Sequence, residues 1–130
     1  MQLSELLTSI PTVREAADRW MADDALYLPN YADHLNTRRP RRVLGVVAVP
    51  WPRRRSDRWT RLVAFGRYHR AYAIIEQLAD VLAPAALETG LVPLIVPFRD
   101  RDLLGMTIDT PFVRRTVANG VVLLDTIARR

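Results

Sequence analysis

The chain has 130 residues, of which 49% are hydrophobic, and it contains no cysteine. This length corresponds to one domain, residues 1–130, with a single core, and the lack of cysteine excludes disulfide and thiolate chemistry. No apolar run reaches the roughly 18 residues of a membrane-spanning helix. Residues 1–10 carry Glu5 and no arginine, which is not the pattern of a secretory signal. We therefore expect a cytoplasmic protein without a membrane segment.

Positive charge is concentrated in the middle of the chain. The net charge is +5, and all 19 basic residues are arginine. The segment Arg38–Arg70, which we call the basic segment, holds eleven arginines against one carboxylate, Asp57. Residues 1–37 hold two arginines against six carboxylates. Two interpretations are open: the basic segment pairs with the acidic N-terminal region, or it faces the phosphate groups of a ligand.

The first predicted elements are helical. Leu3–Leu7 has the apolar pattern of a short helix start. The segment Thr12–Glu15 fits a capping box, and apolar residues then recur at helical spacing, which predicts a second helix to about Tyr27. This helix should stop before Pro29, because a residue that precedes proline disfavours helical geometry. Residues 30–42 are predicted to be a connector.

Two apolar runs follow and predict the central strands of a sheet. Val43–Val49 has no polar residue, which is typical of a strand that is buried on both faces. Trp59–Phe65 is rich in β-forming residues and ends at a glycine. Pro50 and Pro52 cannot donate to a sheet ladder, so they predict a loop between the two strands.

The C-terminal half alternates helices and strands. Tyr68–Ala83 carries one apolar stripe and predicts an amphipathic helix. Leu91–Phe98 contains two prolines and predicts an edge strand or an irregular one, open to pairing in a homodimer. Thr110-Pro111 predicts a helix start, and Val121–Leu124 a last strand. This order predicts an α/β or α+β fold, in which a small mixed β-sheet has helices packed on one side.

Several polar residues are candidates for a site. Trp51 stands beside Arg53, Arg54 and Arg55, where a base could stack on the indole while guanidinium groups hold phosphate. The alternative is a tryptophan that packs over the end of the sheet with arginines across it. Two histidines, one in the predicted connector and one at the start of the amphipathic helix, stand alone and are predicted to be solvated and structural.

Asp100 and Asp102 form an Asp-x-Asp pattern after the third predicted strand. Two carboxylates in this pattern can point at one divalent cation. An arginine stands beside each of them, so the alternative is a solvated turn.

Residues 110–125 read Thr-Pro-Phe-Val-Arg-Arg-Thr-Val-Ala-Asn-Gly-Val-Val-Leu-Leu-Asp. This stretch resembles the C-terminal part of the minimal nucleotidyltransferases of the DNA polymerase β-like superfamily. In that family a helix and a strand precede Pro-Phe-Leu, a short helix and a Gly-Val-Val-Leu-Tyr ending. The preceding helix and strand of this chain fall at the family's positions. The resemblance implies a nucleotidyltransferase-like fold.

The other half of the chain departs from the family pattern. Pro50-Trp51-Pro52 stands where the family has the Gly-Ser that holds nucleotide phosphates. Ser56-Asp57-Arg58-Trp59 stands where the family has Ser-Asp-x-Asp, whose two carboxylates bind Mg²⁺, so only one carboxylate remains. The arginines around it favour an anion rather than a metal. The resulting candidate nucleotide- or phosphate-binding residues are Trp51, Arg53, Arg54, Arg55, Ser56, Arg58 and Arg61.

Three functional hypotheses follow. The first, which the departures favour, is a degenerate nucleotidyltransferase without a cofactor that binds a helical protein partner, as in toxin–antitoxin-like modules. The second is a diverged, active nucleotidyltransferase in which the catalytic Asp57 holds Mg²⁺ together with Asp100 or Asp102. The third is a nucleic-acid-binding module that uses the basic segment Arg38–Arg70.

Overall fold

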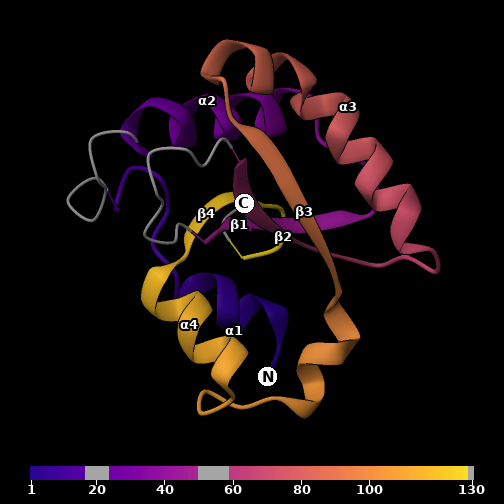
Figure 1. The fold of residues 1–130 in the computed structure, drawn as a ribbon. Coiled ribbons are helices and arrows are strands. Elements are labelled where there is room, and N and C mark those ends of the chain that lie inside the picture. The colour runs from indigo at the N-terminus through magenta and orange to yellow at the C-terminus, as the bar shows by residue number, and fades with distance from the viewer. Residues whose placement is uncertain (17–23, 50–58, 129–130) are drawn as a thin grey trace.

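The computed structural model describes residues 1–16, 24–49 and 59–128 (Figure 1). The helices are α1 (Leu3–Thr8), α2 (Asp24–Thr37), α3 (Ala71–Thr89) and α4 (Pro111–Asn119), with a 3₁₀-helix, η2 (Asp100–Gly105). The strands are β1 (Val43–Ala48), β2 (Trp59–Gly66), β3 (Val92–Arg99) and β4 (Val121–Asp125). None of the helices in these ranges is both long enough and apolar enough to cross a membrane.

The strands form one mixed sheet, which confirms the predicted small α+β fold. Their order is β3-β2-β1-β4, so the proline-containing strand β3 is an edge, as predicted. β1 runs antiparallel to both β2 and β4, whereas β2 and β3 are parallel and are connected through α3. Because parallel strands end on the same side, Gly66 at the end of β2 pairs with Arg99 at the end of β3.

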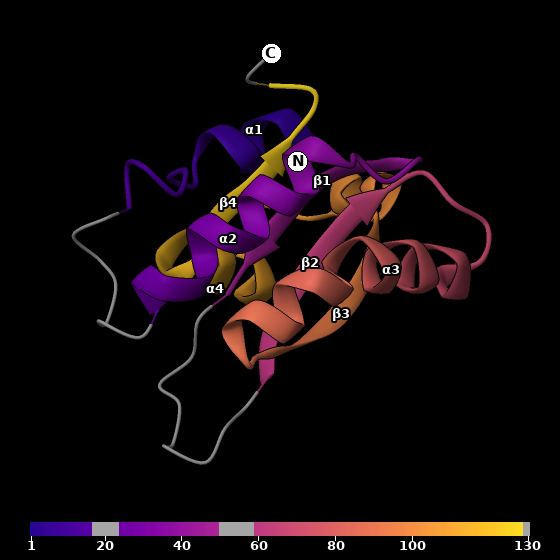
Figure 2. The same ribbon diagram turned by 90° about the horizontal axis from the view of Figure 1, so that it is seen from above.

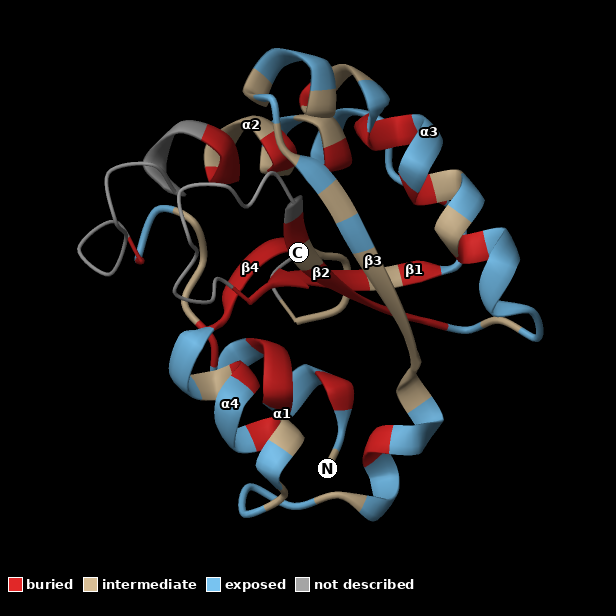
Figure 3. Cartoon of the chain, in the orientation of Figure 1, coloured by how far each residue is buried: buried red, intermediate tan, exposed pale blue. Residues whose placement is uncertain are grey.

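Helices cover both faces of the sheet, which corrects the prediction that they pack on one side. α2 and α3 lie on one face, and α1 and α4 lie on the other (Figures 1 and 2). Val46 and Leu62 belong to the core under α2 and α3, whereas Val47 and Val63 belong to the core that includes α1 and α4. Buried residues run along β1 and β2 without alternation (Figure 3). Such strands need apolar cover on both sides.

The helix α2 departs most from the sequence prediction. It continues through Pro29 to Thr37, so the predicted stop before Pro29 is wrong, and the connector predicted over residues 30–42 is limited to residues 38–42. Proline removes one helical hydrogen bond, but Tyr31 and Leu35, which follow it, are fully buried against the sheet. The burial of this apolar face therefore outweighs the local preference.

The predicted capping box forms at Thr12 and Glu15, and the predicted helix beyond residue 16 lies in part outside the described residues. The Thr12 hydroxyl donates to the Glu15 carboxylate over 2.8 Å and accepts a bond from the Glu15 amide over 3.4 Å. Residues 13–16 nevertheless form turns. The amide of Val122 donates to the carbonyl of Pro11 over 2.9 Å, so this segment lies along the edge strand β4.

Candidate anion-binding site

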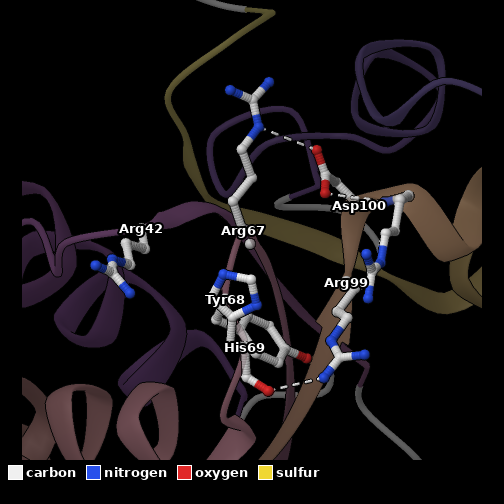
Figure 4. Close-up of a pocket in the computed structure, with 8 residues that line it drawn as sticks. Arg42, Arg67, Tyr68, His69, Arg99 and Asp100 are labelled. Atoms are coloured by element: carbon white, nitrogen blue, oxygen red, sulfur yellow. Dashed lines mark hydrogen bonds and ion pairs between the residues drawn. The ribbon is translucent and has the colours of Figure 1, made fainter.

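Arginine side chains from different parts of the chain meet where the parallel strands β2 and β3 end (Figure 4). A first hollow there has a volume of about 320 Å³. Its lining residues are Arg42, Gly66, Arg67, Tyr68, His69, Arg99, Asp100 and Arg101. In sheets with parallel strands, the space beyond the carboxyl ends of the strands is a frequent place for ligands.

A second hollow of about 390 Å³ adjoins the first and shares Arg42, Tyr68 and His69 with it. It is also lined by Arg41, Arg70, Ala73, Ile74 and Gln77. We call the two hollows together the arginine pocket. The helix α3 begins at the second hollow, with no acidic residue in its first turn and no side-chain cap. The positive end of its dipole therefore adds to the charge of the arginines.

Arg99 is held in place inside the arginine pocket. Its Nη2 donates to the carbonyl of His69 over 2.9 Å, and its guanidinium carbon lies 5.5 Å from the centre of the Tyr68 ring. Burial raises the pKa of the Tyr68 phenol above its usual 10.0, with an opposing effect of Arg99 and a further increase from Asp102. The phenol therefore stays neutral at physiological pH and adds no negative charge to the pocket.

Asp100 is the one carboxylate that lines the arginine pocket among the residues the structure describes, and both of its oxygens are engaged. Asp100 Oδ2 lies 3.3 Å from Arg67 Nε, and Oδ1 accepts a hydrogen bond of 2.9 Å from the amide of Arg101. Among the described residues, no carboxylate forms an ion pair with Arg41, Arg42, Arg70 or Arg101. The pocket therefore keeps a large excess of positive charge.

The backbone of Arg42 is strained. Its φ is 65°, which is the one positive value at a non-glycine residue in the described parts of the chain. The carbonyl of Arg42 accepts a hydrogen bond of 3.0 Å from the amide of Arg67. Strain of this kind is concentrated at functional sites, and here it occurs in one of the three residues that both hollows share.

Most of the sequence-predicted site residues cannot be compared with the arginine pocket, because the described ranges do not include them. Trp51, Arg53, Arg54, Arg55, Ser56, Asp57 and Arg58 lie outside the described residues. Arg61 lines a separate hollow of about 180 Å³ with Val63 and Phe112. That hollow is near the start of β2, whereas the arginine pocket is at its end.

Asp100 and Asp102 both lie in η2, after the end of β3. Only Asp100 lines the arginine pocket, and Asp102 is exposed. The start of β2 is at the other end of the sheet, because Trp59 pairs with Val92. Within the described ranges, no group of three histidine, aspartate or glutamate side chains could hold a metal ion.

The described ion pairs of the basic segment do not involve the acidic N-terminal region. Arg38 pairs with Asp80 over 3.1 Å, and Arg67 pairs with Asp100. The charge pattern of the sequence indicated the basic segment as a whole but did not include Arg99 and Arg101. These two arginines reach the arginine pocket only because β2 and β3 are parallel.

Comparisons with protein-family models, with curated proteins and with solved structures gave no match.

Proposed function

We propose that this protein binds nucleic acid through the arginine pocket, which is the third sequence-based hypothesis with its site moved to the end of β2 and β3. The supporting observation is the convergence of six arginines around one engaged carboxylate. They are Arg41, Arg42, Arg67, Arg70, Arg99 and Arg101. Guanidinium groups bind phosphate oxygens through paired, charge-assisted hydrogen bonds.

The exposure of these arginines favours a ligand with many phosphates. All of the six except Arg99 are exposed. An exposed charge interacts weakly with a single partner because water and salt screen it. A nucleic acid offers a series of phosphates, and the release of its counterions adds to the binding free energy at each one. A small anion with one charge would gain much less from the same surface.

The same geometry favours binding over metal-dependent catalysis. A Mg²⁺ site in phosphoryl transfer needs free carboxylate oxygens. In the arginine pocket, both oxygens of Asp100 already have partners. Cationic side chains line the position where a metal would need acidic ones, so we propose a binding protein that needs no cofactor.

Fluorescence anisotropy with a labelled single-stranded oligonucleotide tests this proposal. We expect the logarithm of the affinity to fall linearly with the logarithm of the salt concentration. Arg101→Ala removes one exposed arginine from the pocket. Arg114→Ala is the matched control, because Arg114 is also exposed but belongs to α4, which lies on the face of the sheet opposite α3. Arg101→Ala should weaken binding, and Arg114→Ala should not. No binding at 50 mM salt, or an equal loss in both variants, would contradict the proposal.

The homodimer that was predicted from the edge strand β3 is the second candidate. Its support is a group of exposed apolar side chains around the start of β3: Leu87 is 88% exposed, Val92 60% and Leu94 44%. Exposed apolar groups of this kind are typical of interaction surfaces. Light scattering tests the homodimer: a mass above 14.9 kDa that Leu94→Glu lowers to the monomer would support it, and a monomer at all concentrations would contradict it.

A further inference from the structure

We infer that the arginine pocket binds two consecutive phosphates of one single strand, with one phosphate in each hollow and Arg42 between them. This inference rests on the proposed function and specifies its ligand. The two hollows share Arg42, Tyr68 and His69, so they are adjacent parts of one surface. Figure 4 shows Arg42 on one side of Tyr68 and His69 and Arg99 on the other.

Each hollow has its own arginines besides the shared Arg42. Arg67, Arg99 and Arg101 line only the first hollow, and Arg41 and Arg70 line only the second. A single phosphate in the first hollow would leave Arg41 and Arg70 without an anion, and one in the second would leave Arg99 and Arg101 without one, whereas Arg67 already pairs with Asp100. Two linked phosphates would use both sets, and the residue between them is the one whose backbone is strained.

The shape of the pocket favours a single strand over a duplex. Strand ends, turns and the beginning of α3 line it, whereas the elements that read duplex DNA are a helix or a β-ribbon placed in a groove. A duplex is stiff over about 150 base pairs and carries its phosphates on a convex surface. A single strand can bend between neighbouring nucleotides, so successive phosphates can enter adjacent hollows.

Competition against the labelled oligonucleotide tests the number and the linkage of the phosphates. The competitors are adenosine 5′-monophosphate, adenosine 5′-diphosphate and the 5′-phosphorylated adenosine dinucleotide. The diphosphate and the dinucleotide both carry two phosphates, but only the dinucleotide separates them by a nucleoside. We expect the dinucleotide to compete about tenfold better than either mononucleotide, since it alone engages charged hydrogen bonds in both hollows.

Variants in each hollow test the assignment of the two positions. Arg101→Ala in the first hollow and Arg70→Ala in the second should each reduce the advantage of the dinucleotide over the monophosphate. Arg114→Ala on α4 should leave that advantage unchanged. A duplex of the same sequence as the labelled oligonucleotide should compete more weakly than the single strand.

The possible outcomes separate this inference from the proposed function. If the oligonucleotide binds but the dinucleotide competes no better than the monophosphate, the two-phosphate inference is wrong and the proposed function stands. Equal competition by the diphosphate and the dinucleotide would overturn the single-strand assignment in favour of a nucleoside diphosphate. Stronger binding of the duplex would overturn it as well. If no oligonucleotide binds, the proposed function itself is wrong.

Discussion

The carbonyl oxygen of Arg42 lies 2.3 Å from the position that a β-carbon on Gly66 would occupy. This close approach connects the start of β1 with the end of β2. The next amide, that of Arg67, donates to the same carbonyl over 3.0 Å. The absence of a side chain at Gly66 thus allows Arg42 to keep its left-handed backbone at the junction of the two hollows.

Gly66→Ala should destabilise the protein by about 1–3 kcal/mol, because the added methyl group meets backbone atoms that cannot move without disturbing the sheet. The free energy of unfolding, measured by urea denaturation, checks this. Gly105→Ala is the matched control, since among the described residues no heavy atom beyond Gly105 and its two chain neighbours lies within 4 Å of its β-carbon position. A loss of the same size in both variants would contradict the steric explanation.

Arg42→Gly should stabilise the fold and weaken ligand binding. Glycine accepts a positive φ without the penalty of about 1 kcal/mol that other residues incur, but the variant lacks a guanidinium that both hollows share. Urea denaturation and oligonucleotide anisotropy on the same samples measure both effects. Arg41→Gly is the control: Arg41 directly precedes Arg42 and has no positive φ, so this substitution should not stabilise the fold. Unchanged or lower stability of Arg42→Gly would show that the strain is absent.

Glu88 connects α3 to α2 and should make stability depend on pH. Its carboxylate accepts a 2.5 Å hydrogen bond from the Asn30 amide, and His34 Nε2 lies 3.4 Å away. These contacts lower the pKa of Glu88 below its ordinary 4.5. The unfolded chain therefore binds the proton more readily, so the stabilisation is complete above pH 4.5 and is lost as the pH falls through the lower, native pKa.

Thermal unfolding of Glu88→Gln against the wild type measures this effect. The wild type should have the higher midpoint at neutral pH, and the gap should close in acid. Glu76→Gln provides the control, because Glu76 is exposed on the same helix. A gap for Glu88→Gln that stays constant from neutral pH into acid would show that the Asn30 and His34 contacts do not stabilise the charged form.

Metal removal should leave nucleic-acid binding unchanged, because guanidinium groups bind phosphate without a bridging cation. Oligonucleotide anisotropy with and without EDTA checks this. Calorimetric titration with Mg²⁺ and ATP tests the alternative of an active nucleotidyltransferase. Tight binding that Asp57→Ala abolishes would favour that enzyme over the present proposal.

The central strands and the edge strand β3 could be predicted from sequence because each has a strong local signal. Val43–Val49 has no polar residue, and the prolines of β3 favour an edge strand or an irregular one. The extent of helix α2 could not be predicted in this way. The local signal at Pro29 indicates a helix end, whereas the helix continues because Tyr31 and Leu35 are buried in the tertiary structure. Helices on both faces follow from the two-sided burial of β1, because such a strand needs apolar cover on each side.

The candidate site could be predicted only in part. The excess charge of the basic segment is visible in the sequence, and it includes four of the six arginines of the pocket. The other two, Arg99 and Arg101, lie about thirty residues further along the chain. They reach the site because β2 and β3 are parallel, and the pairing direction of two strands is not encoded in the residues near either end.

The salt dependence of oligonucleotide affinity tests the central claim most directly. In a plot of the logarithm of affinity against the logarithm of salt concentration, each phosphate contact to a single strand contributes about −0.7 to the slope. The double variant Arg70→Ala/Arg101→Ala, with one substitution in each hollow, should therefore have a slope about 1.4 units shallower than the wild type. An unchanged slope in this variant would show that nucleic acid does not bind in the arginine pocket.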